Sequence, residues 1–113
     1  MKRLAILGLG TMGAGVANRL VAAGNDVSVW NRTSSVAKAF ASSSGARAAD
    51  DIASEVDGAE MVFSFLTDDV ASDLVWAQAL PVCPAGAILV ECSTISPDRA
   101  AEFVNQATGL GFA

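Results

Sequence analysis

The chain has 113 residues, of which 52% are hydrophobic and 17% are charged, and its formal net charge is −5. A chain of this length forms one domain that buries roughly 60–70% of the surface its unfolded form exposes, and this composition excludes intrinsic disorder. No apolar run approaches the length of a membrane span, and no secretory signal is visible at the start. We therefore expect a soluble, cytoplasmic protein with no membrane partner.

The charges are divided unevenly along the chain. Residues 1–47 contain six basic side chains and one acidic one, whereas residues 48–113 contain one basic side chain and eleven acidic ones. An asymmetry of this size often indicates nucleic-acid or membrane binding. Here the basic residues are spread singly, without aromatic residues between them, so we expect no nucleic acid and favour an anionic cofactor bound in the positive half.

The sequence contains two cysteines and no histidine. Cys83 and Cys92 are nine positions apart and do not form a close metal-binding pair, so we expect no zinc site. Both lie in or next to apolar segments, which predicts buried free thiols. The absence of histidine excludes mechanisms in which this chain supplies a histidine general base.

The first predicted element is a strand that runs directly into a glycine motif. Leu4–Leu7 is a continuous apolar run, typical of a parallel strand buried on both faces, and Gly8-x-Gly10-x-x-Gly13 follows it. Gly8 permits a tight turn, Gly10 lets the backbone approach a pyrophosphate, and Gly13 lets the next helix pack close to the strand. The N–H groups of that helix's first turn then bind the phosphates.

The motif therefore predicts a dinucleotide held by Gly8, Leu9, Gly10, Thr11, Met12 and Gly13. Glycine triplets also occur in turns that bind nothing, so the residues on either side decide whether this motif binds a dinucleotide. The apolar residues of the next helix recur at helical spacing, and Gly24 stops it; these residues are Met12, Val16, Leu20 and Ala23. A second strand at residues 26–30 completes one βαβ unit of about 30 residues.

Asn31, Arg32 and Thr33 follow the second strand. NAD-binding units carry an Asp or Glu at this place, about 20 residues past the glycines, to bind the ribose hydroxyls. No carboxylate is present here to repel a 2′-phosphate, and the planar guanidinium of Arg32 matches phosphate oxygens. These residues favour NADP. The alternative is that Arg32 is a solvated side chain at a strand end.

The remaining pattern alternates helices and strands. Thr33 or Ser34 caps a helix that ends at residues 42–45, residues 46–48 form a short strand, and Asp50 or Asp51 caps a brief helix up to Val56. A fourth strand is predicted at 60–66, a helix after 67–69, a fifth strand at 87–92 and a helix from Ser96-Pro97. Residues 109–113 could begin a sixth strand, in which the chain ends.

This order predicts an α/β, Rossmann-type doubly wound parallel sheet with strand order 3-2-1-4-5, truncated at the start of the sixth strand. Ligands of such sheets bind at the carboxyl ends, at the switch between strands 1 and 4. Residues 8–13, 66–68 and 93–95 converge there, so we expect Leu66, Thr67 and Thr94 to contact the cofactor. Helix capping or turn formation is the alternative role of the two threonines.

The chain resembles the β-hydroxyacid dehydrogenases, a group that includes 3-hydroxyisobutyrate dehydrogenase, tartronate semialdehyde reductase and, more distantly, 6-phosphogluconate dehydrogenase. The resemblance rests on residues 8–13, 29–33 and 66–69, and most selectively on Ser93-Thr94-Ile95-Ser96-Pro97 in residues 91–97. It implies that Thr94 lies beside the nicotinamide and that residues 31–33 favour NADP.

The family's substrate-binding segment and catalytic lysine, which lie further along in a helical second domain, have no counterpart here, and Lys2 and Lys38 match no catalytic position. We therefore expect residues 1–113 to be the dinucleotide-binding domain alone, without catalytic residues. The full protein would transfer a hydride between NADP(H) and a small hydroxy acid or its aldehyde or keto acid. The alternatives are an imine reductase domain and a stand-alone nucleotide-binding module. Self-association through an exposed sheet edge is also expected.

Overall fold

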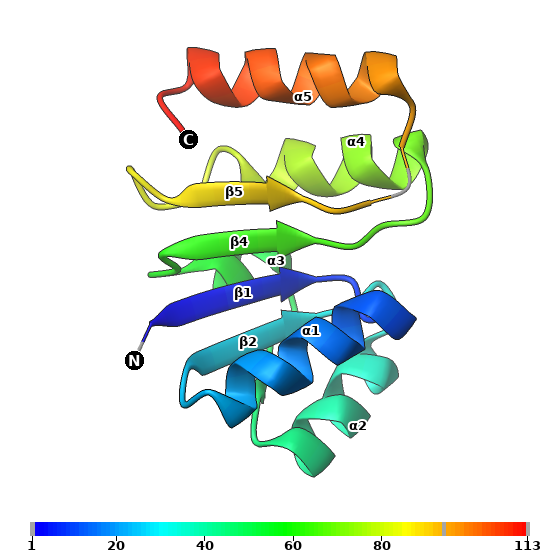
Figure 1. The fold of residues 1–113 in the computed structure, drawn as a ribbon, viewed down its shortest axis with the longest axis vertical. Helices are drawn as coiled ribbons and strands as arrows, with labels where there is room; N and C mark the ends of the chain where they lie inside the picture. Colours follow the sequence, from blue (N-terminus) through cyan, green and yellow to red (C-terminus); the bar gives the residue numbers. More distant parts are fainter. Residues whose placement is uncertain (1, 94, 113) are drawn as a thin grey trace.

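The computed structural model describes residues 2–93 and 95–112. Five parallel strands form one sheet in the order β3-β2-β1-β4-β5 (Figure 1). The strands are β1 (Arg3–Leu7), β2 (Asp26–Trp30), β3 (Arg47–Ala48), β4 (Met61–Ser64) and β5 (Ile88–Glu91). This order confirms the predicted doubly wound topology, with β1 and β4 meeting where the winding changes direction.

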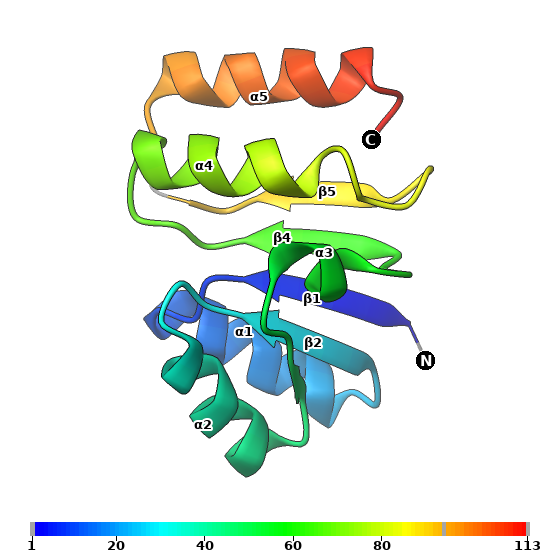
Figure 2. The same ribbon diagram turned by 180° about the vertical axis from the view of Figure 1, so that it is seen from behind.

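Five helices connect and follow the strands: α1 (Thr11–Ala22), α2 (Ser34–Ser44), α3 (Ile52–Val56), α4 (Asp69–Ala79) and α5 (Pro97–Gly109). Figures 1 and 2 show α1 on one face of the sheet, α3 and α4 on the other, and α5 along the outer side of β5. The expected helix starts are confirmed: Thr33 occupies the N-cap of α2, and the Asp51, Asp68 and Ser96 side chains accept hydrogen bonds from the first turns of α3, α4 and α5.

The sheet separates two hydrophobic clusters because successive side chains of β1 point to opposite faces. Ala5 and Leu7 belong to the cluster under α3, α4 and α5, whereas Ile6 belongs to the cluster under α1 and α2. Trp76 is fully buried in the first cluster and its ring centroid lies 4.6 Å from that of Phe103, which fastens α5 to α4. A strand buried on both faces explains the unbroken apolar run in the sequence.

The buried face of α1 differs from the prediction. Gly13 and Ala17 are the buried residues of this helix, while Met12 is 63% exposed. The small residues allow α1 to lie close to the sheet, whereas Leu20 of the predicted face is half-buried and packs against the second cluster. Strands 4 and 5 are also shorter than expected, at Met61–Ser64 and Ile88–Glu91: one residue precedes each strand, and residues 65–66 and 92 enter the loops of the carboxyl edge.

The predicted sixth strand is absent from the described part of residues 109–113. Gly109 is the last residue of α5, and Leu110 and Gly111 form a turn with a φ of 88° at Gly111. Phe112 donates a backbone hydrogen bond to the Ala107 carbonyl oxygen at 2.9 Å and packs against the first cluster. The turn therefore leaves the apolar Phe112 half-buried. Within residues 2–93 and 95–112, no helix is long and apolar enough to cross a membrane.

Candidate dinucleotide-binding site

The three glycines of the loop after β1 are needed for different reasons. Gly8 has a φ of 99°, and a Cβ there would overlap the Phe65 carbonyl oxygen; a Cβ on Gly13 would overlap the carbonyl oxygen of Gly8. A Cβ on Gly10, in contrast, would meet no protein atom within 4 Å. The fold thus requires the first and third glycines, whereas the second leaves open space in front of the loop. This space fits a group that must approach the backbone closely, as a pyrophosphate does.

Helix α1 begins at this open space. Its N-cap, Gly10, supplies no capping side chain, and no acidic residue lies in the first turn. The first backbone N–H groups of a helix lack partners within the helix, and the helix dipole places partial positive charge at the same end. The start of α1 is therefore suited to an anionic group such as a phosphate.

Asn31 holds the glycine loop in place from the end of β2. Its Oδ1 accepts a hydrogen bond from the Leu9 backbone N–H at 2.9 Å, and its Nδ2 donates to the Thr33 carbonyl oxygen at 3.3 Å. The Gly8 N–H also donates to the Trp30 carbonyl oxygen at 2.8 Å. The Asn31 amide therefore binds the protein's own backbone, which positions the loop and leaves the next side chain, Arg32, exposed to solvent.

Three adjoining cavities form a groove along the carboxyl edge of the sheet, with volumes of about 320, 350 and 400 Å³. Leu66 lines all three. The first is lined by the start of α1 together with Phe65, Leu66, Thr67 and Cys92. The second lies over Gly8–Gly10 and reaches Asn31 and Arg32, and the third continues between Arg32 and α4. The groove thus passes the glycine loop midway, as an extended dinucleotide requires.

Most residues predicted from the sequence come together in this groove. Ten of the predicted residues line its cavities: Gly8, Leu9, Gly10, Thr11, Met12, Gly13, Asn31, Arg32, Leu66 and Thr67. Thr33 lies beside them at the N-cap of α2. Thr94 lies outside the residues that the structure describes.

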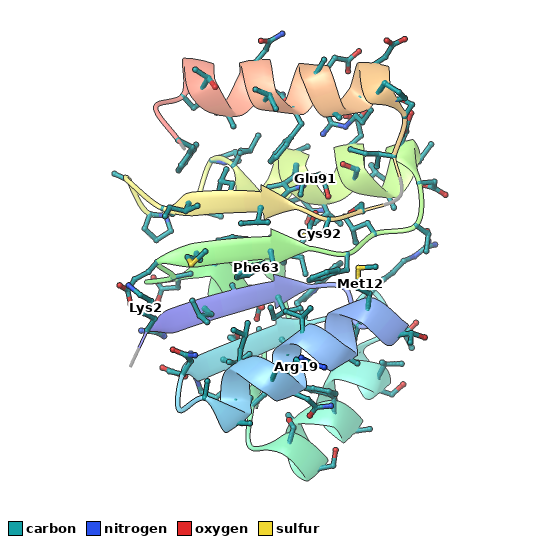
Figure 3. The ribbon with its side chains drawn as sticks, viewed as in Figure 1. Lys2, Met12, Arg19, Phe63, Glu91 and Cys92 are labelled. Carbon is teal, nitrogen blue, oxygen red and sulfur yellow. The ribbon has the colours of Figure 1, made fainter. Side chains whose placement is uncertain are left out.

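Sequence reasoning missed several residues that line the groove, among them Cys92, Val70 and Leu74. Cys92, expected to be buried, is exposed and borders the first cavity, because it follows β5 at the carboxyl edge (Figure 3). Val70 and Leu74 are 69% and 61% exposed on α4 and line the third cavity. Their signal was present in the sequence as apolar positions on an amphipathic helix, but periodicity alone does not distinguish a core face from a ligand groove.

The connection from β5 to α5 is anchored to the loop after β4 before position 94 and to α4 after it. The Asp69 carboxylate accepts hydrogen bonds from the Ser96 backbone N–H at 2.7 Å and from its hydroxyl at 2.6 Å. These bonds lower the pKa of Asp69, so it remains a carboxylate at neutral pH. The Ser93 hydroxyl accepts a hydrogen bond from the Leu66 backbone N–H at 2.6 Å. The two loops that border the first cavity are thus tied together.

Burial raises the pKa of the Cys83 thiol to about 11, and burial together with the nearby Glu91 raises that of Cys92. Both cysteines are free.

Within the described residues, no group of three or more His, Cys, Asp or Glu side chains could hold a metal ion. The groove therefore offers backbone donors, one guanidinium, hydroxyls and apolar surface, a set that suits a nucleotide.

The family of the chain follows from comparison with known proteins. Residues 3–113 match the NAD-binding domain of 6-phosphogluconate dehydrogenase. The chain belongs to this family. The match covers the glycine loop, the end of β2 and the loop after β5, and it confirms the resemblance seen in the sequence.

The chain spans less than half the length of the similar proteins described next. A cytokine-like nuclear factor, N-PAC, of Danio rerio is 36% identical over 113 residues, which cover 97% of this chain and 24% of that protein. The structure of Mycobacterium tuberculosis 3-hydroxyisobutyrate dehydrogenase with L-serine has a TM-score of 0.92 and 27% identity, over 99% of this chain and 38% of that one. An imine reductase of Streptomyces aurantiacus has a TM-score of 0.87 and 30% identity, over 99% and 39%.

Proposed function

We propose that the chain is the NADP-binding domain of an oxidoreductase that transfers a hydride between NADP(H) and a small hydroxy acid or its aldehyde or keto acid. A nicotinamide dinucleotide is the cofactor class of this family. When bound, the cofactor supplies the hydride or accepts it. The protein's own residues bind and orient the cofactor along the groove.

The choice of NADP rests on one observation, the position of Arg32. Its exposed side chain lies where the second and third cavities meet. An adenosine 2′-phosphate placed there meets a guanidinium, whereas an acidic residue would repel it. The apolar side chains of Val70 and Leu74 on α4 offer a surface for the adenine ring across the cavity from Arg32. The start of α1 would hold the pyrophosphate, and the first cavity would receive the nicotinamide.

The test compares the affinities of the two cofactors by titration calorimetry. A hydrogen bond to a charged group contributes about 1.5–3 kcal/mol, so NADP(H) should bind on the order of 10 to 150 times tighter than NAD(H). Arg32→Ala should remove most of this preference while changing NAD(H) affinity little. Arg19→Ala, an exposed arginine in the last turn of α1, is the matched control and should keep the preference. Equal affinities for the two cofactors in the unaltered chain would contradict the proposal.

An imine reductase remains the second candidate because one such enzyme is 30% identical to this chain. The two activities share this domain, so the cofactor groove does not separate them. Ser93 and the Ser96-Pro97 helix start favour the hydroxyacid dehydrogenases, through the resemblance of residues 91–97. Assaying the full natural protein with hydroxy acids and with cyclic imines would distinguish the two candidates.

A further inference from the structure

Glu91, the last residue of β5, lies at the centre of a polar cluster beneath the cofactor groove (Figure 3). Its Oε2 accepts hydrogen bonds from the Ser72 hydroxyl at 2.9 Å and from the Trp76 indole N–H at 2.9 Å, both on α4. Its Oε1 accepts a bond from the Ser64 hydroxyl and a second from the Ser93 backbone N–H at 3.1 Å. Four donors therefore converge on one carboxylate, which offers about four acceptor positions.

A chain of hydrogen bonds leads from this carboxylate to the groove. The Ser93 and Ser64 hydroxyl oxygens lie 3.2 Å apart, and the Ser93 hydroxyl also accepts from the Leu66 N–H. A backbone N–H can only donate and a carboxylate can only accept, and each hydroxyl has a single hydrogen. The direction is thereby fixed: the Leu66 N–H donates to Ser93, Ser93 donates to Ser64, and Ser64 donates to Glu91.

This series of hydrogen bonds connects two loops of the groove to buried residues of β4 and α4. Ser64, Ser72 and Trp76 are fully buried, so the carboxylate is fixed between β4 and α4. At the other end, Leu66 lines all three cavities of the groove, and Ser93 follows Cys92, which borders the first. Because Ser64 and Glu91 are paired in register across β4 and β5, the carboxylate sits directly below the point where these two strands leave the sheet.

We infer that Glu91 is a positioning residue for the cofactor: through Ser64 and Ser93 it sets the Leu66–Thr67 and Cys92–Ser93 loops at the spacing that the bound nicotinamide half requires. This inference rests on the proposed function for its ligand. The carboxylate touches no cavity of the cofactor groove itself, so it acts through the loops it holds. Preordering these loops reduces the conformational entropy that the chain loses when the cofactor binds.

The first variant is Glu91→Gln, which preserves shape but replaces one acceptor oxygen by a donor that faces other donors. Hydrogen exchange of the 113-residue chain without cofactor should then accelerate at the Leu66 amide by about tenfold or more relative to the Phe65 amide. Phe65 is the internal reference because its N–H donates to the carbonyl oxygen of Leu7, the last residue of β1, at 2.8 Å and makes no contact with the Ser93 hydroxyl. A merely structural loss of stability would accelerate both amides equally and would contradict the inference.

Cofactor affinity gives the second readout. Glu91→Gln should raise the Kd of NADPH about tenfold, equivalent to about 1.4 kcal/mol. Ser93→Ala removes the hydroxyl that links Leu66 to Ser64 in this series of hydrogen bonds and leaves the Glu91 carboxylate in place. It should raise both the Kd of NADPH and the exchange rate of the Leu66 amide. Ser28→Ala also removes a buried serine hydroxyl that donates to a glutamate, but that glutamate is Glu55, outside the Glu91 cluster, so it should leave the Leu66 exchange rate relative to Phe65 and the Kd within about twofold of the unaltered protein.

These outcomes separate the inference from the proposed function. If the unaltered chain binds neither NADPH nor NADH, the proposed function fails, whatever the exchange rates show. If it binds NADPH and both Glu91→Gln and Ser93→Ala bind it equally well, the positioning role of Glu91 is wrong. Should Glu91→Gln fail to fold, Ser93→Ala decides alone, with Ser28→Ala as its matched control.

Discussion

The glycine motif shows at the residue scale how far a sequence can specify a site. Gly8 and Gly13 could be predicted because a tight turn and a closely packed helix leave no room for a side chain. In the structure, a backbone carbonyl oxygen lies where the Cβ atom of any other residue would be at each of these two positions. Cys92 was predicted wrongly because an apolar neighbourhood in sequence was taken for burial in space. Cys92 follows β5 and therefore lines the first cavity of the groove.

The unequal surroundings of the glycines lead to a prediction that separates binding from folding. Gly10→Ala adds a methyl group to open space, so the chain should keep its stability while cofactor affinity falls by at least about tenfold. Gly13→Ala pushes α1 away from the carbonyl oxygen of Gly8 and should destabilise the fold by about 1–3 kcal/mol. Urea unfolding with parallel calorimetry checks both. A Gly10→Ala variant that binds NADPH normally would show that the open space is not the pyrophosphate site.

At the scale of elements, the strands were predictable because a parallel strand buried on both faces is uniformly apolar. The buried face of α1 was predicted in part: Gly13 was expected to pack close to the strand, whereas Ala17 was not singled out because periodicity follows large apolar residues. The hydrogen bonds that Glu55 and Glu91 accept were also not predicted from the sequence. Glu55 bonds Ile6, 49 positions away, and Glu91 bonds Ser64, 27 positions away, so nothing local in the sequence pairs them.

Helix α3 carries Glu55 into the core, where it links this helix to β1 and β2. Only 1% of Glu55 is exposed, and its carboxyl accepts hydrogen bonds from the Ile6 N–H at 2.9 Å and from the Ser28 hydroxyl. Burial raises the pKa of Glu55 to about 8, against the opposing effects of these hydrogen bonds and of the Arg47 charge. Below that pH the folded protein therefore holds Glu55 in its neutral form.

A dependence of stability on pH follows from this shift. The pKa of Glu55 is about 8 when folded and near 4.5 when unfolded, so the folded state retains the proton more strongly. Its contribution is complete below about pH 4.5 and is lost as the pH rises to about 8, a loss on the order of a few kcal/mol. Asp51 and Asp69, whose pKa values are lowered, lose their contribution only in the acid range.

Glu55→Gln should therefore flatten the decline in unfolding free energy between pH 5 and about pH 8.5, measured by urea unfolding. Glu102→Gln, a change at an exposed position of α5, is the control and should leave the decline intact. An equal decline in the unaltered chain and in Glu55→Gln would assign the effect to other groups.

For the whole molecule, the doubly wound topology could be predicted because alternating helices and strands admit few arrangements. Right-handed crossovers keep the strands parallel, so that all their carboxyl ends lie at one edge of the sheet. In place of the predicted start of a sixth strand, the described residues after α5 form a turn that packs the half-buried Phe112 against the first hydrophobic cluster. Strand β5 remains at the edge of the sheet, with α5 alongside it (Figure 1). Self-association through that edge stays a prediction, which sedimentation over a range of concentrations can test.

The lysines lie outside the cofactor groove. Lys2 borders a separate cavity with Glu60 and Pro84, and its Nζ lies 3.9 Å from the Glu60 carboxylate. Lys38 is on α2, and its Nζ lies 3.8 Å from the Asp50 carboxylate. The sequence has no histidine and no tyrosine. In the part of the chain that the structure describes, the groove thus contains none of these three proton donors.

We therefore expect residues 1–113 to bind NADPH without oxidising a hydroxy acid or reducing its aldehyde. Hydride transfer requires the substrate carbon to be held about 3–3.5 Å from the nicotinamide, and such positioning can supply roughly 7–11 kcal/mol of the barrier. The similar enzymes are more than twice as long as this chain. Adding the part of such a relative that lies beyond the matched residues, covalently or in trans, should restore turnover measured by NADPH absorbance if the two parts can dock. Oxidation of 3-hydroxyisobutyrate by the purified chain alone, persisting in Lys2→Ala and Lys38→Ala, would place the chemistry within these residues after all.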